Sequence, residues 1–171
     1  MFPFKGLQRL TGVTLLAALS PSSPSVPAAG SGVVFVDLID YPTQEANWDR
    51  FHSLEDRLAS AFHEVCAEGG CVPRRFLWPM QVRCSVQTPQ ATVAACVWII
   101  AGSNLMVGAT GHITPDVTVW QCLLPLPTSI AVEQFHAALE VRDPLSVRFP
   151  GSPATLRQGL QACLKASGSR A

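Results

Sequence analysis

Six cysteines constrain this chain more than any other feature of its sequence. They are Cys66, Cys71, Cys84, Cys96, Cys122 and Cys163. An even number of cysteines in a small exported domain is typical of a disulfide framework. Cys66 and Cys71 enclose Ala-Glu-Gly-Gly, and the two glycines allow so short a loop to close into a local bridge. The sequence therefore predicts a small domain held by three disulfides.

The first 28 residues have the composition of a secretory signal peptide. Lys5 and Arg9 lie beside the N-terminal amine, residues 10–19 form an apolar run, and Val26-Pro27-Ala28 satisfies the −3/−1 rule for cleavage. We expect cleavage after Ala28, with Ala29 as an equally close alternative. The apolar run is too short to span a bilayer, and the leader contains no cysteine that could carry a lipid. The mature protein is thus expected in the periplasm or outside the cell, without a membrane anchor.

The remaining chain has the size and composition of one globular domain. With 171 residues and 48% apolar side chains, the chain is long enough to bury a single core. We assign residues 29–32 to a flexible leader, residues 33–166 to one domain and residues 167–171 to a tail. Lys plus Arg and Asp plus Glu each number 12, so the chain lacks the basic field that binds phosphate backbones. Nucleic acid is therefore not an expected partner.

The N-terminal part of the domain predicts a strand followed by an amphipathic helix. Residues 33–39 are mainly β-branched and aromatic and end at Asp40-Tyr41-Pro42, as in a strand closed by a turn. From Asn47, a plausible N-cap, apolar residues recur at helical spacing up to Gly69-Gly70, which stops the helix. The apolar stripe of this helix consists of Trp48, Phe51, Leu54, Leu58, Phe62 and Val65.

Three antiparallel strands are predicted next, over residues 77–87, 92–101 and 117–124. Alternation along these strands gives one apolar face, which the helix stripe is expected to cover. The members of this predicted core face are Met80, Val82, Cys84, Val86, Ala94, Cys96, Trp98, Ile100, Trp120, Cys122 and Leu124.

The cysteines also predict how these strands are aligned. Facing residues of a hairpin have position numbers with a constant sum. Turns centred near residues 90 and 109 therefore place Cys84 opposite Cys96, and Cys96 opposite Cys122. The same alignment places Trp98 opposite Trp120.

Two further helices are predicted toward the C-terminus. The first covers residues 129–139, and the second begins after Ser152 as N-cap, with Pro153 at its first position. This last helix presents Cys163 inward. Since only two cysteines of the sheet row can bond each other, we favour a Cys84–Cys96 bridge and a Cys122–Cys163 bridge. The predicted fold is α+β, an antiparallel three- to four-stranded meander sheet packed on an N-terminal helix, with a C-terminal helix, stapled by disulfides.

No pattern in the sequence carries a catalytic or metal-binding signature that would assign an activity. There is no Gly-x-Ser-x-Gly turn and no Asp-x-Asp calcium loop. His52 and His63 share a helix face, but they are ~16 Å apart along the axis, so one ion cannot bind both. Glu55 interrupts the apolar stripe and needs a partner, such as Arg83 or Arg74-Arg75. We therefore assign no catalytic residue, no metal and no cofactor.

The reverse face of the predicted sheet is the candidate binding surface. Arg83, Val97, Ile99 and Gln121 mark it, and His112 lies in a Gly-rich loop on the same scaffold. The leading hypothesis is a secreted or periplasmic, non-enzymatic binding protein, an inhibitor or immunity-type factor that acts through a protein partner, because disulfides rigidify a surface without requiring an active site.

Two alternatives stay open at this point. A small periplasmic hydrolase would use Glu55 or His112 as its base with an arginine as electrophilic partner, and would show a deep polar pocket at one of them. A structural subunit would lend residues 33–39 to a neighbouring sheet, and would show an unpaired apolar edge strand.

The leader generates a first testable prediction. The exported protein should begin near Ala29, because the basic, apolar and small-residue regions of residues 1–28 match a cleavable signal. Sequencing of the N-terminus of the protein recovered from the periplasm or medium checks this. An intact Met1 in that fraction would contradict it.

Overall fold

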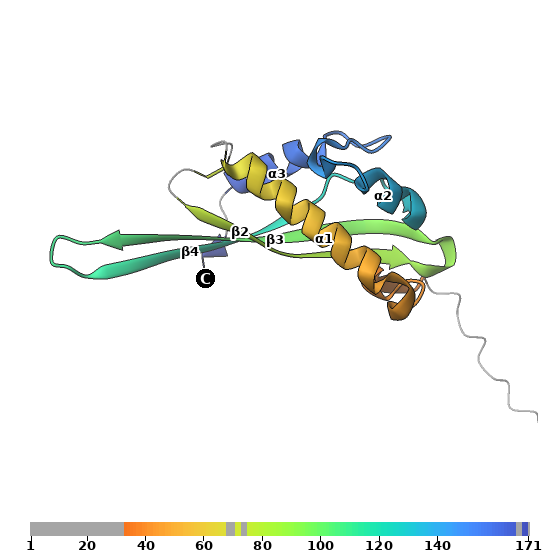
Figure 1. Ribbon diagram of the computed structural model, residues 1–171, viewed down its shortest axis with the longest axis horizontal. Coiled ribbons are helices and arrows are strands. Elements are labelled where there is room, and N and C mark those ends of the chain that lie inside the picture. The colour runs from red at the N-terminus through yellow and green to blue at the C-terminus, as the bar shows by residue number, and fades with distance from the viewer. Residues whose placement is uncertain (1–32, 68–70, 73–74, 167–168, 171) are drawn as a thin grey trace, which may run out of the picture. The chain divides into compact units, whose positions relative to one another are not determined.

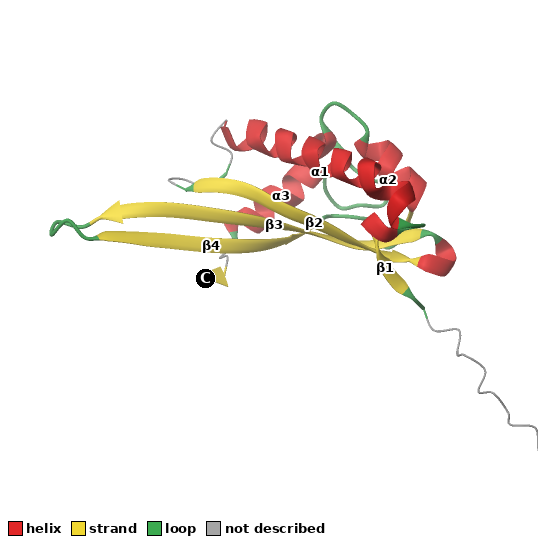
Figure 2. Ribbon diagram, turned by 60° about the horizontal axis from the view of Figure 1, so that its bottom comes forward, coloured by secondary structure: helices red, strands yellow, loops and turns green. Residues whose placement is uncertain are grey.

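In the computed structural model, residues 33–67, 71–72, 75–166 and 169–170 are described. The signal peptide, the flexible leader and the glycine pair expected to stop the first helix lie outside these residues. In the described part, three helices lie on one side of an antiparallel sheet, as Figures 1 and 2 show. They are α1 (Gln44–Ala67), α2 (Val132–Leu139) and α3 (Leu156–Lys165). The α+β fold is thus confirmed. Among the described helices, none is both long and apolar enough to cross a bilayer.

The sheet has three long strands and three short ones. The long strands form the predicted meander and are β2 (Phe76–Gln87), β3 (Thr92–Val107) and β4 (Ile113–Leu123). The short strands are β1 (Phe35–Asp37) beside β2, β5 (Ile130–Ala131) beside β3, and β6 (Ser169–Arg170) beside β4. Strand β6 comes from the segment that the sequence analysis assigns to the tail. Three short 3-10 helices, η1 (Leu38–Asp40), η2 (Thr88–Gln90) and η3 (Pro144–Ser146), connect longer elements.

The three disulfides favoured from the sequence are all formed. Cys66 is bonded to Cys71, Cys84 to Cys96 and Cys122 to Cys163. The last bridge ties β4 to α3 across 41 residues of chain. A disulfide that closes a loop of this length lowers the conformational entropy of the unfolded chain. In typical proteins this stabilises the folded state by about 2–4 kcal/mol.

The first strand and helix differ from the prediction at their ends. The strand has only three residues, because the chain turns into η1 at Leu38. Helix α1 begins at Gln44, and the hydroxyl of Thr43 accepts a hydrogen bond from the Ala46 amide. Asn47 is therefore no N-cap: it is buried inside the helix, where its amide donates to the Leu38 carbonyl. Trp48 lies outside the buried stripe and is 46% exposed.

The alignment of the strands is confirmed in the first hairpin and wrong by two residues in the second. Cys84 faces Cys96, as predicted. Trp98, however, faces Cys122 rather than Trp120, and Trp120 faces Ile100. The reason is that β3 and β4 continue to a turn centred one residue later than predicted. Because the shift is an even number of residues, each side chain keeps its face.

Two β-bulges change which residues point into the core. Met80 and Ala94 are the extra residues where the pairing of β2 and β3 skips one position. A bulge reverses the alternation locally. Pro79 and Val93 therefore take the buried positions, and Met80 is 60% exposed.

The C-terminal helices start later than predicted. Helix α2 begins at Val132, after the two residues of β5. Helix α3 begins after Thr155, which forms a capping box with Gln158. Ser152 does not cap it, because its hydroxyl instead donates to the Pro125 carbonyl.

The core lies between the helices and the inner face of the sheet. Trp98 is at its centre, 2% exposed, with its ring in edge contact with Phe62 of α1 at 5.6 Å between centroids. The side chains of Trp120 and Leu77 pack against the backbone of Gly102, so a side chain at position 102 would collide with both.

Gly102→Ala tests this packing. An added Cβ would lie 2.6 Å from Cζ3 of Trp120 and 2.8 Å from Cδ2 of Leu77, so the free energy of unfolding should fall by about 1–3 kcal/mol. Gly108→Ala is the matched control, because the nearest atom there is 3.5 Å away. Urea unfolding measures both variants. Equal losses in the two would show that the close approach at Gly102 is not real.

Candidate functional site

The face of the sheet opposite the helices, the open face, is largely apolar, and its three long strands carry one charged side chain there, Arg83. Figure 2 shows no helix of the described residues on this side. Strand alternation and the pairing registers give its members. They are Phe76, Trp78, Met80, Gln81, Arg83, Ser85 and Gln87 of β2, Thr92, Ala95, Val97, Ile99, Ala101, Ser103, Leu105 and Val107 of β3, and Ile113, Pro115, Val117, Val119, Gln121 and Leu123 of β4.

Most of these side chains are apolar, and several are largely exposed. Phe76 and Leu105 are each 68% exposed and Leu123 is 65% exposed. The rings of Phe76 and Trp78 stack at 6.3 Å, and Trp78 also contacts His63 of α1 at the edge of β2. Few soluble monomers expose contiguous apolar surface of this kind.

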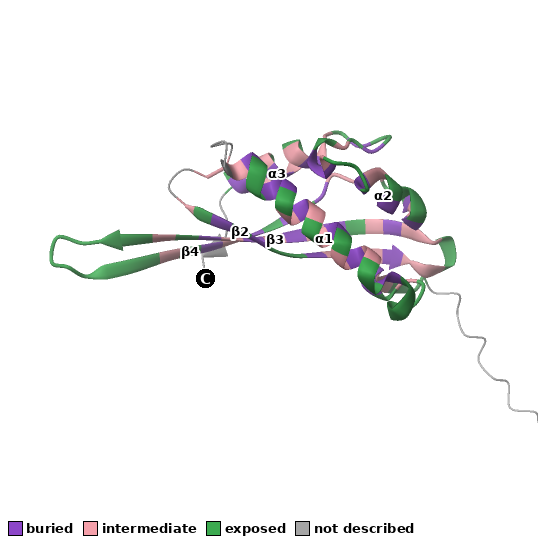
Figure 3. Ribbon diagram, in the orientation of Figure 1, coloured by how far each residue is buried: buried purple, intermediate pink, exposed green. Residues whose placement is uncertain are grey.

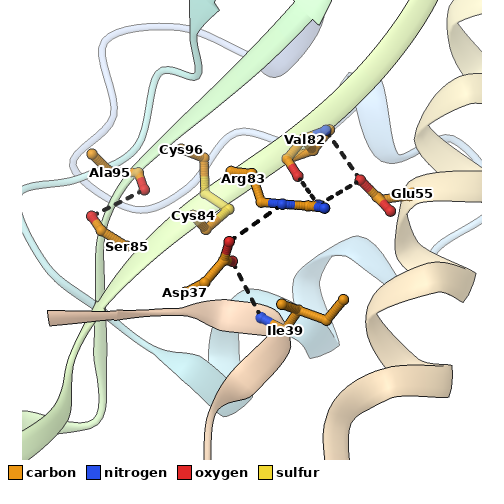
Figure 4. Close-up of a disulfide and its surroundings, with 9 residues drawn as sticks. All are labelled: Asp37, Ile39, Glu55, Val82, Arg83, Cys84, Ser85, Ala95 and Cys96. Carbon is orange, nitrogen blue, oxygen red and sulfur yellow. Dashed lines mark hydrogen bonds and ion pairs between the residues drawn. A yellow bond between two sulfur atoms is a disulfide. The ribbon is translucent and has the colours of Figure 1, made fainter. Parts of the chain in front are cut away.

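The Cys84–Cys96 disulfide lies directly behind one end of the open face. The two cysteines face each other across β2 and β3 and are buried on the helix side. Their sequence neighbours Arg83 and Val97 also face each other, on the opposite side of the sheet. The bridge therefore fixes the strands that carry Arg83 and Val97, and Figure 4 shows it beside Arg83.

A cluster of ion pairs holds Arg83 at the edge of β2. Its Nε lies 3.3 Å from Asp37 Oδ2, and its Nη1 lies 3.2 Å from Glu55 Oε1 (Figure 4). Glu55 Oε1 also accepts the Val82 amide at 3.1 Å, while Arg83 Nη1 donates to the Val82 carbonyl at 2.7 Å. The two side chains thus satisfy both backbone groups of Val82 where β1 has ended. Glu55 also pairs with Nδ1 of His52 at 3.2 Å.

A shallow depression of about 390 Å³ lies on the sheet beside this cluster. It is open to solvent and mainly apolar, with Phe35, Ala95 and Val97 in its lining and Asp37 and Arg83 at its charged side. Because these two charges pair with each other, the depression offers apolar surface rather than a free ion. It suits an aliphatic or aromatic side chain better than a charged ligand.

At the opposite end, β3 and β4 continue beyond β2 as a two-stranded arm, residues 104–116. The arm projects from the helix-covered part of the sheet, and Figure 3 shows it as almost wholly exposed. Val107 is 72% exposed and faces Ile113, which is 58% exposed. Hydrogen bonds from Gly108 to the His112 carbonyl and from Gly111 to the Gly108 carbonyl close the turn. Gly111 has φ +81°, a conformation that favours glycine.

The structure brings together four of the five residues singled out from the sequence. Arg83 faces Val97, and Ile99 faces Gln121, so these four lie on one continuous surface. His112 belongs to the turn of the arm, about 30 Å away along the strands at ~3.4 Å per residue. Arg83 is engaged by two carboxylates and is less available to a partner than its position on the face suggests.

Sequence reasoning missed the arm and its apolar residues. The predicted strand of residues 92–101 ended just before Gly102-Ser103-Asn104, a tripeptide whose composition is typical of a turn. The signal that could have found the arm is the alternation itself. Apolar residues continue at every second position past this tripeptide to Val107, and resume at Ile113.

Glu55 and His112, the two alternative bases of the hydrolase hypothesis, lie in different parts of the structure. Glu55 contacts Val82 and Arg83 near β1, whereas His112 lies at the tip of the arm. Neither residue lines the depression. Arg83 is the partner that the sequence analysis suggested for Glu55, and the pair protects a strand edge.

His136 of α2 is a titratable group that is fully buried. Neither ring nitrogen has a hydrogen-bond partner among the described residues. Burial, reinforced by Arg50 and Arg57 of α1, lowers the pKa of His136 to about 4, although Glu133 and Glu140 oppose the shift. His136 is therefore neutral in the folded protein near pH 7.

Comparison of the chain with protein-family models, curated proteins and solved structures found no match.

The lowered pKa of His136 predicts that the free energy of unfolding decreases in acid. Because its pKa is about 4 when folded and about 6.5 when unfolded, the unfolded chain binds the proton more tightly. The free energy of unfolding should be unaffected above pH 7 and should fall by ~2 kcal/mol by pH 5 from this group alone. Urea titrations at both pH values measure the loss.

His136→Leu should remove most of this pH dependence, and His112→Gln, at the exposed tip, should keep it. A His136→Leu variant with the slope of the unmodified protein would show that another group titrates.

Proposed function

We propose that this protein is an exported, non-enzymatic binding protein that engages a protein partner through the open face. The observation that carries the proposal is that face itself, a largely apolar surface on a disulfide-stapled sheet, whose one charged side chain on the long strands, Arg83, is paired with Asp37 and Glu55. Inhibitors and immunity-type factors belong to this class of function, because they act by covering a partner and need no catalytic group of their own.

The cysteines support a periplasmic or extracellular location. All six are paired, and such pairing persists in oxidising compartments. The signal-like leader predicts the same compartments. In those compartments the bridges would keep the binding surface in one conformation, which lowers the entropy lost on association.

The form of the surface favours a protein over a smaller ligand or a nucleic acid. Ligand sites for small molecules are concave and enclose most of the ligand, whereas the depression here is shallow and open. Nucleic acids require a positive surface, and the open face has no cation along β3 or β4. A broad apolar surface is the feature that protein interfaces use at their centres.

The alternatives have less support. A hydrolase based on Glu55 would have to release a carboxylate that already binds the Val82 amide, Arg83 and His52. A subunit that lends its first strand would have to break the pairing of Phe35, Val36 and Asp37 with β2.

Leu123→Asp tests the proposal. Leu123 is 65% exposed on the open face, so a carboxylate there should weaken binding to a partner at least tenfold while changing stability by ~0.5 kcal/mol or less. Val141→Asp is the matched control, an apolar residue 42% exposed on another part of the surface. Tagged, oxidised protein is incubated with extract from the source cells, and retained proteins are identified by mass spectrometry.

The proposal requires a protein other than this chain that the unmodified protein and Val141→Asp retain and Leu123→Asp loses. Equal retention by Leu123→Asp and the control would place the binding surface elsewhere. Retention of no other protein by the unmodified chain would reject the proposed function.

A further inference from the structure

The exposed apolar area of the open face is large enough for a stable interface. Eight of its side chains are more than 40% exposed: Phe76, Trp78, Met80, Leu105, Val107, Ile113, Val117 and Leu123. From ordinary residue areas, they expose on the order of 900 Å², against the ~800 Å² that each partner contributes to a standard interface. A monomer rarely leaves so much contiguous apolar surface in water.

The arm is the part of this surface that would be stabilised most by packing against another protein layer. It contains only two strands, and a two-stranded ribbon is marginally stable in water without packing against another layer. Val107 and Ile113 face each other near its tip, and both point to the open face. Burial of these side chains against a partner would stabilise the ribbon as well as the complex.

The two ends of the open face are complementary in shape. The arm projects at one end, and the depression lined by Phe35, Ala95 and Val97 lies at the other. Ala101 is midway, six residues from Ala95 and six from Val107 along β3, or ~20 Å in each direction. A two-fold axis that lies in the plane of the face and crosses the strands at Ala101 would therefore place each tip over the other copy's depression.

We infer that, in the absence of another protein, the open face is covered by the open face of a second copy of this chain, in a two-fold antiparallel arrangement. The Val107–Ile113 tip of each copy occupies the depression of the other. Such a contact is isologous and closes as a dimer. The only charges at the depression, Asp37 and Arg83, pair with each other, so no unpaired charge is buried.

A lipid surface fits the arm less well than a second copy. Segments that bind membrane interfaces combine apolar residues with Lys or Arg that contact anionic headgroups. The arm has no Lys or Arg, and its one acidic residue, Asp116, is paired with Arg75. The tip thus offers apolar surface without the cations that would hold it at a bilayer.

This inference rests on the proposed function, since it assigns an occupant to the same face. A heterologous partner would then bind by displacing the second copy. The dimer and the proposed function can be rejected independently, because self-association is measured on the purified protein and partner capture is measured in extract.

Sedimentation velocity of the purified, oxidised protein from 0.1 to 50 μM tests the dimer. We expect a dimer that the double substitution Val107→Asp and Ile113→Asp converts to monomer, with the dissociation constant raised at least a hundredfold. Met106→Asp is the matched control and should remain dimeric, because Met106 is 51% exposed on the same arm but points to the opposite face. Circular dichroism checks that all variants stay folded.

Cross-linking tests the antiparallel arrangement. A Val107→Cys protein mixed with an Ala95→Cys protein should yield a linked heterodimer with a short thiol-reactive cross-linker. Val107→Cys mixed with Val141→Cys should yield none.

Three results would overturn the inference. They are a monomer throughout the concentration range, a dimer that the tip substitutions leave intact, and a dimer without the 107-to-95 cross-link. Binding of the monomeric protein to neutral phosphatidylcholine vesicles, abolished by the tip substitutions, would assign the arm to lipid instead. If the protein is monomeric but Leu123→Asp still loses a captured protein, the dimer is rejected and the proposed function stands.

Discussion

The structure depends on the burial of one sheet face beneath the three described helices, of which α1 is the longest. Trp98 sits at the middle of that contact, with Phe62 of α1 above it and Val82 and Cys122 on the neighbouring strands. A large aromatic side chain in such a position contributes several kcal/mol, because its loss would leave a large cavity. The disulfides on the same face reinforce this contact, one across β2 and β3 and one from β4 to α3.

The same arrangement leaves the other face of the sheet without a helix of the described residues. Strand alternation requires a second set of side chains opposite the buried set, and in this protein that set is also apolar. By contrast, the exposed edge of β2 is protected. Pro79 has no amide hydrogen to donate, Met80 forms a bulge, and Glu55 and Arg83 satisfy the backbone of Val82. Devices of this kind block strand addition, so the sheet is suited to association through its face rather than its edge.

The location of the charges has a consequence for stability as well as for binding. Arg50 of α1 forms ion pairs with Glu133 and Glu140 of α2 at the surface, and the neutral His136 of α2 is buried. The contact between these two helices therefore combines exposed ion pairs with a buried imidazole that resists protonation. It lies on the helix side of the molecule, away from the open face, so protonation of His136 at low pH would destabilise the fold at a distance from that face.

The sequence by itself determined the fold class, most of the inner face and one end of the open face, and it favoured the three bridges that are formed. These follow from local rules, namely alternation in strands, the period of a helix and the spacing of cysteines. Only the tertiary structure decided the extent of β3 and β4, the two-residue shift of their alignment and the exchange of Met80 for Pro79 in the core. Gly102-Ser103-Asn104 has the composition of a turn, but Gly102 is needed inside the sheet because Trp120 and Leu77 leave no room for a side chain. That requirement comes from residues distant in the chain, and for this reason the turn-like composition of the tripeptide was a misleading guide, although the alternation continues past it.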